Sequence, residues 1–200
     1  MYILLSILLA YLLGSISTST LITRWRAKID IRDVGSGNAG ATNTLRVLGV
    51  RWGLVVLALD ACKGVLATLL AMAMVHHQPL VWFVAGLAVV VGHNWPVFFG
   101  FRGGKGIATT IGVYLVLLPI PALVAGVIAI LLIAVTRYVS LGALSFVILT
   151  PVFCIAFGRP VTLILFAVLI AALSVYRHRQ NIVRLVRGQE HRVFSRHHEL

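Results

Sequence analysis

The sequence predicts an all-α, polytopic membrane protein, and three observations support this fold class. Hydrophobic residues make up 60% of the 200 residues, and the mean hydropathy is +1.02. Only 11% of the residues are charged, whereas water-soluble domains contain about 25%. Apolar runs long enough to form membrane-spanning helices recur along the whole chain. We therefore predict a single integral membrane domain over residues 1–200.

Seven apolar segments are predicted to cross the membrane. The run from 107 to 135 is too long for one upright helix of about 20 residues, and Pro119 and Pro121 interrupt it. Because the residue before a proline is disfavoured in helical geometry, we divide this run into two short spans joined by a tight turn. The predicted spans are Tyr2–Thr23, Gly53–Val75, Leu80–Phe98, Ile107–Leu118, Pro121–Val135, Leu141–Phe157 and Val161–Tyr176.

The basic residues orient these spans. Of the 17 Lys and Arg residues, only Arg159 lies in the alternate set of loops and only Lys63 lies within a span. The positive-inside rule then places the N-terminus outside and the C-terminal tail in the cytoplasm. A six-span arrangement would place the basic tail outside, which favours seven. The net charge of +12 is explained by topology and anionic lipid and does not indicate nucleic-acid binding.

A glycine-rich segment, Gly35–Arg46, follows the first span on the predicted cytoplasmic side. Glycines let backbone N–H groups turn toward a ligand, and an arginine offers a planar fork to an oxyanion. A dinucleotide-binding reading of its glycines fails, since that motif needs a preceding strand, and a plain linker would need neither its two Asn nor its Thr-Asn pair. We interpret the segment as a phosphate nest formed by Ser36, Gly37, Asn38, Gly40, Ala41, Thr42, Asn43 and Arg46.

A second candidate runs from His93 to Gly106, between the third and fourth predicted spans. Lys105 follows Gly104 in a glycine turn just before a helix start, where charge and helix N–H groups together can hold a phosphate. It is no Walker loop, because the spacing is wrong and Gly106 replaces the Mg²⁺-binding hydroxyl. The alternative for Arg102 and Lys105 is that their side chains extend toward the lipid headgroups. His93 and Asn94 either contact substrate or, as we slightly favour, satisfy buried backbone groups near Pro96.

Two further pairs of residues share a helical face. Asp60 and Lys63 lie three apart inside the second span, where intramembrane ionisable residues are functional candidates by default. A self-neutralising pair that supports the loop from below is an equal alternative. His178 and Asn181 lie three apart in a basic tail segment. Attachment of that segment to anionic lipid would explain its arginines but not the His–Asn pair.

Several classes of chemistry are not supported by the sequence. There is no G-x-S-x-G nucleophile motif, no His followed five positions later by Asp, and only 5 acidic residues to ligate a metal. Cys62 and Cys154 lie in apolar runs and are interpreted as packing residues. Binding and charge neutralisation by cations and N–H groups are therefore the main catalytic resources that we expect.

Taken together, these motifs resemble the bacterial acyl-phosphate:glycerol-3-phosphate acyltransferase family, PlsY, and the resemblance covers essentially the whole chain. Two departures are visible: Ser17 stands where the family usually has Pro, and Ala143 stands where some members carry a hydroxyl. The resembling segments are Gly35–Arg46, Asp60-x-x-Lys63-Gly64, Gly92-His-Asn-x-Pro96, Phe101–Gly106, Arg137-Tyr-x-Ser140-Leu141 and Arg177-His-x-x-Asn181 through Glu190.

The resemblance implies transfer of a fatty acyl group from acyl phosphate to the sn-1 hydroxyl of glycerol 3-phosphate, the first step of phospholipid synthesis. It implies no cofactor or metal. We also expect a monomer that spans a bacterial inner membrane with its active site on the cytoplasmic face, and supply of acyl phosphate by the enzyme that makes it. Glycerol 3-phosphate would be held by Ser36, Arg46, Lys105, His178 and Asn181. Acyl phosphate would be cradled by backbone N–H groups of Gly40–Asn43, with Thr42 and Ser140. Supporting roles would fall to Asp60, Lys63, His93, Asn94 and Glu190.

Two other functions remain open at the level of the sequence. Seven short helices interrupted by Pro and containing Asp60 and Lys63 could form a carrier for phosphate or an organophosphate. The anion-binding features, however, crowd on the cytoplasmic side, and the outer loops are short and nearly uncharged. A lipid-binding scaffold would leave the glycine-rich segment unexplained.

Overall fold

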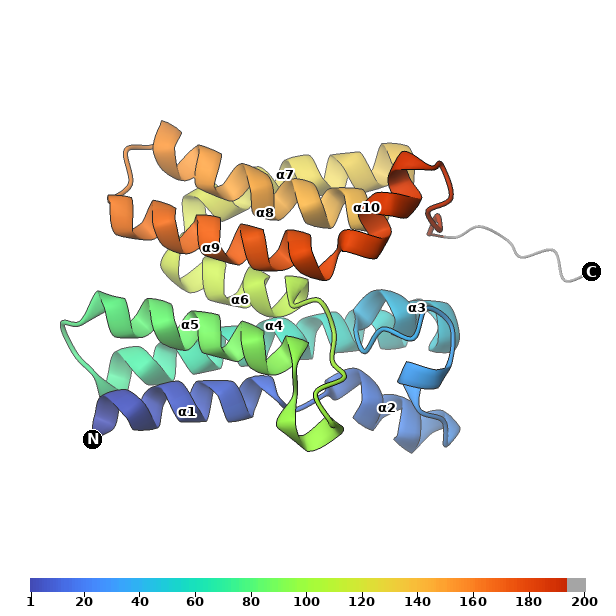
Figure 1. Ribbon diagram of the computed structural model, residues 1–200, viewed down its shortest axis with the longest axis horizontal. Coiled ribbons are helices and arrows are strands. Elements are labelled where there is room, and N and C mark those ends of the chain that lie inside the picture. The colour runs from blue at the N-terminus through green and yellow to red at the C-terminus, as the bar shows by residue number, and fades with distance from the viewer. Residues whose placement is uncertain (194–200) are drawn as a thin grey trace, which may run out of the picture. The chain divides into compact units, whose positions relative to one another are not determined.

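The computed structural model describes residues 1–193, and these residues form α-helices and short 3-10 helices without any strand (Figure 1). The chain divides into two compact units, Met1–Pro119 and Ile120–Leu200. The all-α class predicted from composition is therefore confirmed for the described part of the chain.

The first unit is built on three long apolar helices, α1, α4 and α5, which pack on one another, and on α6, which packs mainly on α4. Close approach of α1 and α5 depends on Gly92, because a side chain there would run into the carbonyl of Tyr11. The elements are α1 (Tyr2–Gly14), α2 (Thr18–Ala27), η1 (Ile31–Asp33), α3 (Ala41–Leu48), α4 (Val50–Met74), α5 (Pro79–Asn94), η2 (Val97–Phe99) and α6 (Ile107–Leu117).

The first predicted span is interrupted at its centre. It was expected as one helix over Tyr2–Thr23, but α1 ends at Gly14 and α2 begins at Thr18. The break leaves backbone carbonyls without helical donors. The Lys63 ammonium donates to two of them, the carbonyls of Gly14 (3.1 Å) and Ile16 (3.0 Å). A charged side chain of α4 thus replaces the helical hydrogen bonds that the break removes.

The second unit contains α7 (Pro119–Thr136), α8 (Val139–Ala156), α9 (Val161–Arg177) and the short α10 (Arg179–Val186). Helices α8 and α9 pack side by side. The chain bends by 65° between α9 and α10. His178 stands at this bend and caps both helices.

Each of the seven predicted apolar segments contains a helix, and the first contains two. Helix α6 ends at Leu117 and α7 starts at Pro119, so the division of the long run at its prolines is confirmed; proline fits the first turn of a helix. Within the described residues, five segments are long and apolar enough to cross a membrane when α1 and α2 are counted as one, or six if α9 and α10 also form one span. Helix α6 is shorter, so the count of seven crossings and their sidedness stay predictions.

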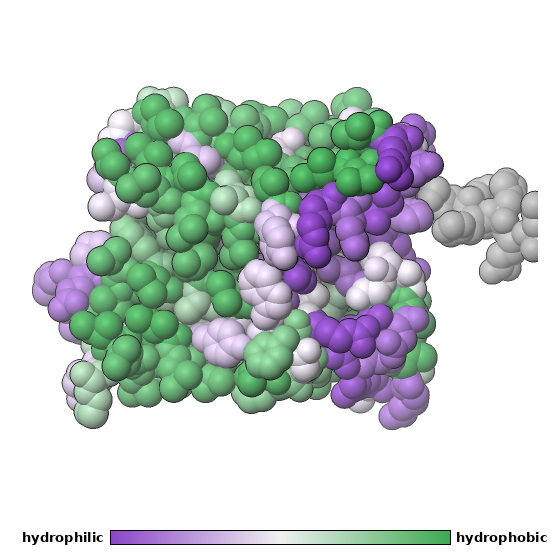
Figure 2. All heavy atoms as spheres, viewed as in Figure 1, coloured by the Kyte–Doolittle hydropathy of each residue, from purple (hydrophilic) through white to green (hydrophobic). Residues whose placement is uncertain are grey.

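The exposed surface of the first unit is divided by polarity. Hydrophobic side chains cover α1 and α5 in Figure 2, whereas hydrophilic residues gather at the end formed by α2 and α3. Leu4 and Leu66, for example, are 77% and 57% exposed. Exposed leucines on spanning helices are expected where lipid is the solvent, and the polar end carries the segments described next.

Candidate active site

The glycine-rich segment is a loop only as far as Gly40. It was expected to be a loop over Gly35–Arg46, but residues from Ala41 onward form α3, with Gly40 as its N-cap. Helix α3 leaves its first N–H groups, those of Ala41, Thr42 and Asn43, without intrahelical acceptors. These groups mark the positive end of the helix dipole, which suits an anion. Thr42 and Arg46 are four residues apart on α3 and therefore share one face.

The Asn43 side chain holds the loop together. Asn43 is 1% exposed. Its Oδ1 accepts from the N–H of Ser36 (2.9 Å), and its Nδ2 donates to the carbonyls of Ile31 (3.1 Å) and Val34 (3.0 Å). The Asn43 side chain therefore braces the loop. Ser36 and Gly37 remain exposed and Asn38 is half-buried on the loop that Asn43 shapes.

The turn that contains Lys105 (residues 102–106, called the Lys105 turn below) meets the glycine-rich loop at Gly104. The Gly104 N–H donates to the His93 carbonyl (3.1 Å). A Cβ built on Gly104 would lie 2.6 Å from the carbonyl oxygen of Ala39 and against Nε2 of His93. Only glycine therefore fits between the ring and the loop. Two segments more than 60 residues apart in the sequence are brought together here, and Lys105 is half-buried next to their contact.

A buried charged cluster lies on α4 and α5 near the same turn. The predicted Asp60–Lys63 pair is confirmed, with Lys63 Nζ at 2.8 Å from Asp60 Oδ1. The same Nζ lies 2.9 Å from Nδ1 of His93, and Thr18 donates to Asp60 Oδ1 (2.7 Å). Asp60, Lys63 and His93 are 1%, 4% and 7% exposed. The cluster connects the break between α1 and α2 with the residue that holds Gly104.

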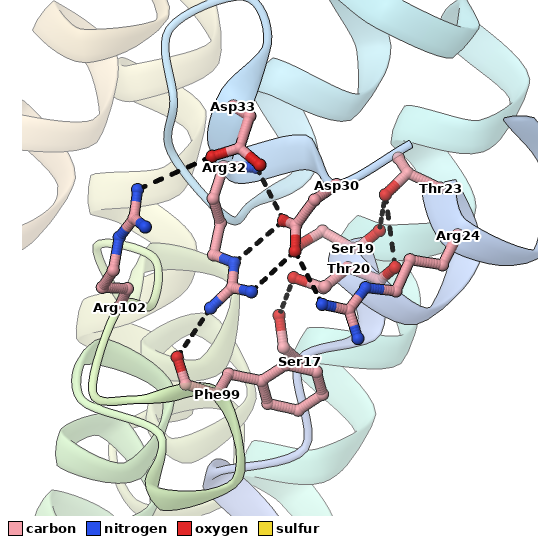
Figure 3. A network of polar contacts seen from close by, with 10 residues as sticks. All are labelled: Ser17, Ser19, Thr20, Thr23, Arg24, Asp30, Arg32, Asp33, Phe99 and Arg102. Carbon is pink, nitrogen blue, oxygen red and sulfur yellow. Dashed lines mark hydrogen bonds and ion pairs between the residues drawn. The ribbon is translucent and has the colours of Figure 1, made fainter. Parts of the chain in front are cut away.

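A second polar network, drawn in Figure 3, ties η1 to the loop before Lys105. The Arg32 guanidinium donates to both carboxylate oxygens of Asp30 (2.8 and 2.6 Å) and to the carbonyl of Phe99 (2.6 Å). Arg24 also donates to Asp30 (2.8 Å). From the sequence, Arg32 was counted only as a topology charge. An acid two residues before an arginine in a predicted loop was the available signal for this bridge.

The Asp30 carboxylate stays ionised well into acid. Hydrogen bonds from the Arg32 guanidinium, more than offsetting the effect of partial burial, hold the pKa of Asp30 well below its usual range. In return, Asp30 raises the pKa of Arg32. The bridge between η1 and the Phe99 loop is therefore fully charged at neutral pH.

The second unit carries the remaining predicted site residues. His178 is buried, and its Nδ1 lies 2.8 Å from the Ser174 carbonyl, so Nδ1 carries a proton that it donates. Asn181 Nδ2 donates to Glu190 (2.8 Å), which also accepts from Arg184 (3.0 Å). The Glu190 carboxylate thus fixes which end of the Asn181 amide faces it.

Two predicted residues are buried without hydrogen-bond partners among the described residues. The Ser140 hydroxyl has none. Neither amide atom of Asn94 has one, although Asn94 is fully buried. The favoured role for Asn94, satisfying backbone groups near Pro96, is therefore not found. Nδ1 of His93 faces Lys63.

The predicted site residues consequently fall in both units. Ser36 through Arg46, Asp60, Lys63, His93, Asn94 and Lys105 belong to the first, and Ser140, His178, Asn181 and Glu190 belong to the second. Over residues 1–193, no group of three or more His, Cys, Asp or Glu side chains is placed to hold a metal ion.

Comparisons with known proteins agree on one family. Residues 4–188 match the family described as glycerol-3-phosphate acyltransferase. A glycerol-3-phosphate acyltransferase of Shouchella clausii is 53% identical over 197 residues, with 96% of each chain covered. One from Halalkalibacterium halodurans is 52% identical over 190 residues, with 92% of each chain covered.

Solved structures are similar over nearly the whole chain. The glycerol 3-phosphate form of PlsY, an integral membrane glycerol 3-phosphate acyltransferase, has a TM-score of 0.90 at 42% identity and covers 96% of this chain and 95% of its own. The lysophosphatidic acid form has a TM-score of 0.86, also at 42% identity, and covers 95% of this chain and 94% of its own.

Proposed function

The chain belongs to the glycerol-3-phosphate acyltransferase family, and we propose that it transfers a fatty acyl group from acyl phosphate to the sn-1 hydroxyl of glycerol 3-phosphate. The products are lysophosphatidic acid and inorganic phosphate. Relatives at 42% identity were solved as glycerol 3-phosphate and lysophosphatidic acid forms, which supports this substrate and this product. Acyl phosphate as the donor is what the resemblance of the motifs to the family implies.

The observation that supports the proposal most directly is the meeting of the Lys105 turn with the glycine-rich loop at Gly104. Both proposed substrates carry a phosphate group. The loop supplies N–H groups at the start of α3, and the turn supplies an ammonium group at the start of α6. Phosphate binding needs this combination of fixed dipoles and positive charge.

The proposed reaction needs no nucleophile from the protein, because an acyl phosphate is already an activated anhydride. The sn-1 hydroxyl oxygen attacks the carbonyl carbon, a C–O bond forms, and the bond between that carbon and the phosphate oxygen breaks. The hydroxyl proton passes to a phosphate oxygen of the substrate. The protein contributes alignment of the two substrates and stabilisation of developing negative charge.

Roles for individual residues follow from the motifs of the family. We assign glycerol 3-phosphate to Ser36, Arg46, Lys105, His178 and Asn181, and acyl phosphate to the N–H groups of Gly40–Asn43 with Thr42 and Ser140. Two structural observations support these roles. Arg46 lies on the same face of α3 as Thr42, and the buried Ser140 hydroxyl has no partner in the described part of the chain.

We further propose that the protein works as a monomer in the bacterial inner membrane, with its site on the cytoplasmic face. Fifteen basic residues in one set of predicted loops support this orientation. A donor made in the cytoplasm would then reach the site directly from the enzyme that produces it.

The reaction is tested with protein purified in detergent, palmitoyl phosphate and glycerol 3-phosphate. We expect phosphate and lysophosphatidic acid to appear in equal amounts. Lys105→Met and Arg46→Ala should each lower kcat/KM about 100-fold, because each removes a charge-assisted hydrogen bond worth about 3 kcal/mol. The matched control is Arg51→Ala, which removes an exposed arginine at the start of α4 and should stay within about twofold of the wild type.

A well-folded protein that forms no lysophosphatidic acid but moves phosphate into proteoliposomes would overturn the proposal in favour of a carrier. Detection of an acyl-enzyme would contradict direct attack. Ser36→Ala with wild-type turnover would remove Ser36 from the substrate contacts.

A further inference from the structure

We propose that His93 is a positioning residue that holds the Lys105 turn and the glycine-rich loop in register through a neutral imidazole protonated at Nε2. The inference rests on the proposed function, because these two segments are the proposed phosphate-binding elements. His93 acts through Gly104 and Ala39, which precede Lys105 and Gly40 in the sequence.

Lys63 determines which ring nitrogen carries the proton. Its Nζ lies within 3.1 Å of four groups: the carbonyls of Gly14 and Ile16, the carboxylate of Asp60, and Nδ1 of His93. An ammonium group donates and never accepts. Our proposal therefore assigns Nδ1 of His93 as an acceptor from this ammonium, 2.9 Å away, and places the proton of the neutral ring on Nε2.

The charged groups shown to face the ring come from α4. Asp60 and Lys63 on α4 face His93, with Asp60 Oδ1 at 3.6 Å from Nδ1. The break between α1 and α2 contributes carbonyls and the Thr18 hydroxyl to this cluster, all of them uncharged. One carboxylate already balances one ammonium. An imidazolium would add a second cation 2.9 Å from the first at a site closed to water, which is strongly unfavourable.

The other edge of the ring faces the active-site segments. A Cβ on Gly104 would lie against Nε2 of His93 and 2.6 Å from the Ala39 carbonyl oxygen. The Nε2–H edge, the Lys105 turn and the glycine-rich loop thus meet at one point. The His93 carbonyl also accepts the Gly104 N–H (3.1 Å), so His93 contacts the turn through its backbone as well as lying against it with its ring.

This arrangement explains why a charged cluster lies inside a spanning helix. Asp60 neutralises Lys63, Lys63 orients the imidazole, and the imidazole sets the spacing between the ammonium of Lys105 and the N–H groups of α3. The hydroxyl and the acyl carbonyl can react only when both phosphates are held at the correct separation. A misplacement of about 1 Å at such a site lowers the rate about 100-fold.

Two substitutions test the roles of the two ring nitrogens separately. In His93→Asn the amide oxygen stands at the position of Nδ1 and can accept from Lys63, but nothing replaces Nε2–H. In His93→Gln the amide nitrogen reaches the position of Nε2 and can donate there. We expect His93→Asn to lower kcat about 100-fold, with the KM for glycerol 3-phosphate changed less than about threefold. We expect His93→Gln to stay within about fivefold of wild-type kcat.

The matched control is His76→Gln, a substitution at an exposed histidine between α4 and α5, which should leave both parameters unchanged. Thermal unfolding of each variant separates misfolding from misalignment. Equal kcat for the two His93 variants, or a more active His93→Asn, would overturn the proposal.

Nitrogen-15 NMR of histidine-labelled wild-type protein tests the tautomer without relying on any variant's activity. The His93 ring is identified by the signals that His93→Gln lacks. A neutral ring with its proton on Nε2 supports the inference, and a proton on Nδ1 or on both nitrogens contradicts it. Failure of the wild type to make lysophosphatidic acid would instead refute the proposed function, so the two failures are distinguishable.

Discussion

Single charged side chains in this chain donate to backbone carbonyls of irregular segments. Lys63 donates to two carbonyls at the break between α1 and α2, and Arg32 donates to the Phe99 carbonyl in the loop before α6. Each is paired with an aspartate, Asp60 or Asp30. Such pairs matter less as isolated ion pairs than as connections between irregular backbone segments.

The Asp30 pair makes a prediction about pH. Its folded pKa is lowered by Arg32, so the stabilisation is complete above the ordinary aspartate pKa of about 3.9 and is lost as the pH falls toward the folded value. Asp30→Asn should therefore lower the melting temperature at pH 7 by about 3 °C. The difference from the wild type should shrink progressively below about pH 4. Thermal unfolding in detergent across this pH range measures it.

Asp33→Asn is the matched control, since Asp33 and Arg102 are 3.9 Å apart and both are well exposed. Its melting temperature should follow the wild type at every pH. A stability gap for Asp30→Asn that stays constant down to pH 3 would contradict the assignment.

At the scale of the helices, packing in the first unit depends on small residues at crossing points. Helix α6 lies so close to α4 that a Cβ at Gly112 would run into the Ala61 carbonyl and lie 2.9 Å from the Val65 nitrogen. Without a hydrophobic driving force between helices in lipid, such close contact is a main source of association. Because α6 follows directly after Lys105, its seating on α4 also sets the position of the turn.

Gly112→Ala should lower stability by about 1–3 kcal/mol, because it overpacks the contact between α4 and α6. The matched control is Gly126→Ala on α7, where a Cβ meets nothing within 4 Å. That change should be neutral or stabilising by up to about 1 kcal/mol through helix propensity. Denaturation in mixed detergent compares the two. Equal stability of the variants would show that the contact does not matter.

At the scale of the whole molecule, the basic residues predict which loops face the cytoplasm. In a background lacking Cys62 and Cys154, His76→Cys should react with a membrane-impermeant thiol reagent in intact cells. Lys28→Cys and Arg187→Cys should react only after permeabilisation, because positively charged loops stay inside. A six-span arrangement places Arg187 outside, so its labelling in intact cells would contradict seven spans. Labelling of Lys28→Cys in intact cells would contradict the predicted orientation and indicate the opposite one.

Local signals were sufficient for most of the fold. Apolar length predicted the helices, the prolines at 119 and 121 divided α6 from α7, and spacing of three residues paired Asp60 with Lys63. The motifs identified the family, which the comparisons confirm. The break at Ser15–Ser17 was missed although Gly14 and the hydroxyl residues after it mark a weak point in the helix, because the sequence does not show that Lys63, far along the chain, donates to the carbonyls there.

By itself, the sequence determined the helical class, the approximate ends of the spans and the residue types available to bind phosphate, since these depend on hydropathy, proline geometry and side-chain chemistry within a short window. Only the tertiary structure decided that Asn43 braces the loop, that Arg32 bridges to Phe99, and that His93 meets both Lys63 and Gly104. Each of these contacts joins atoms whose separation is set by helix packing. Hydrogen bonds act over about 3 Å, so the partners of a polar side chain are known only once the helices are in place.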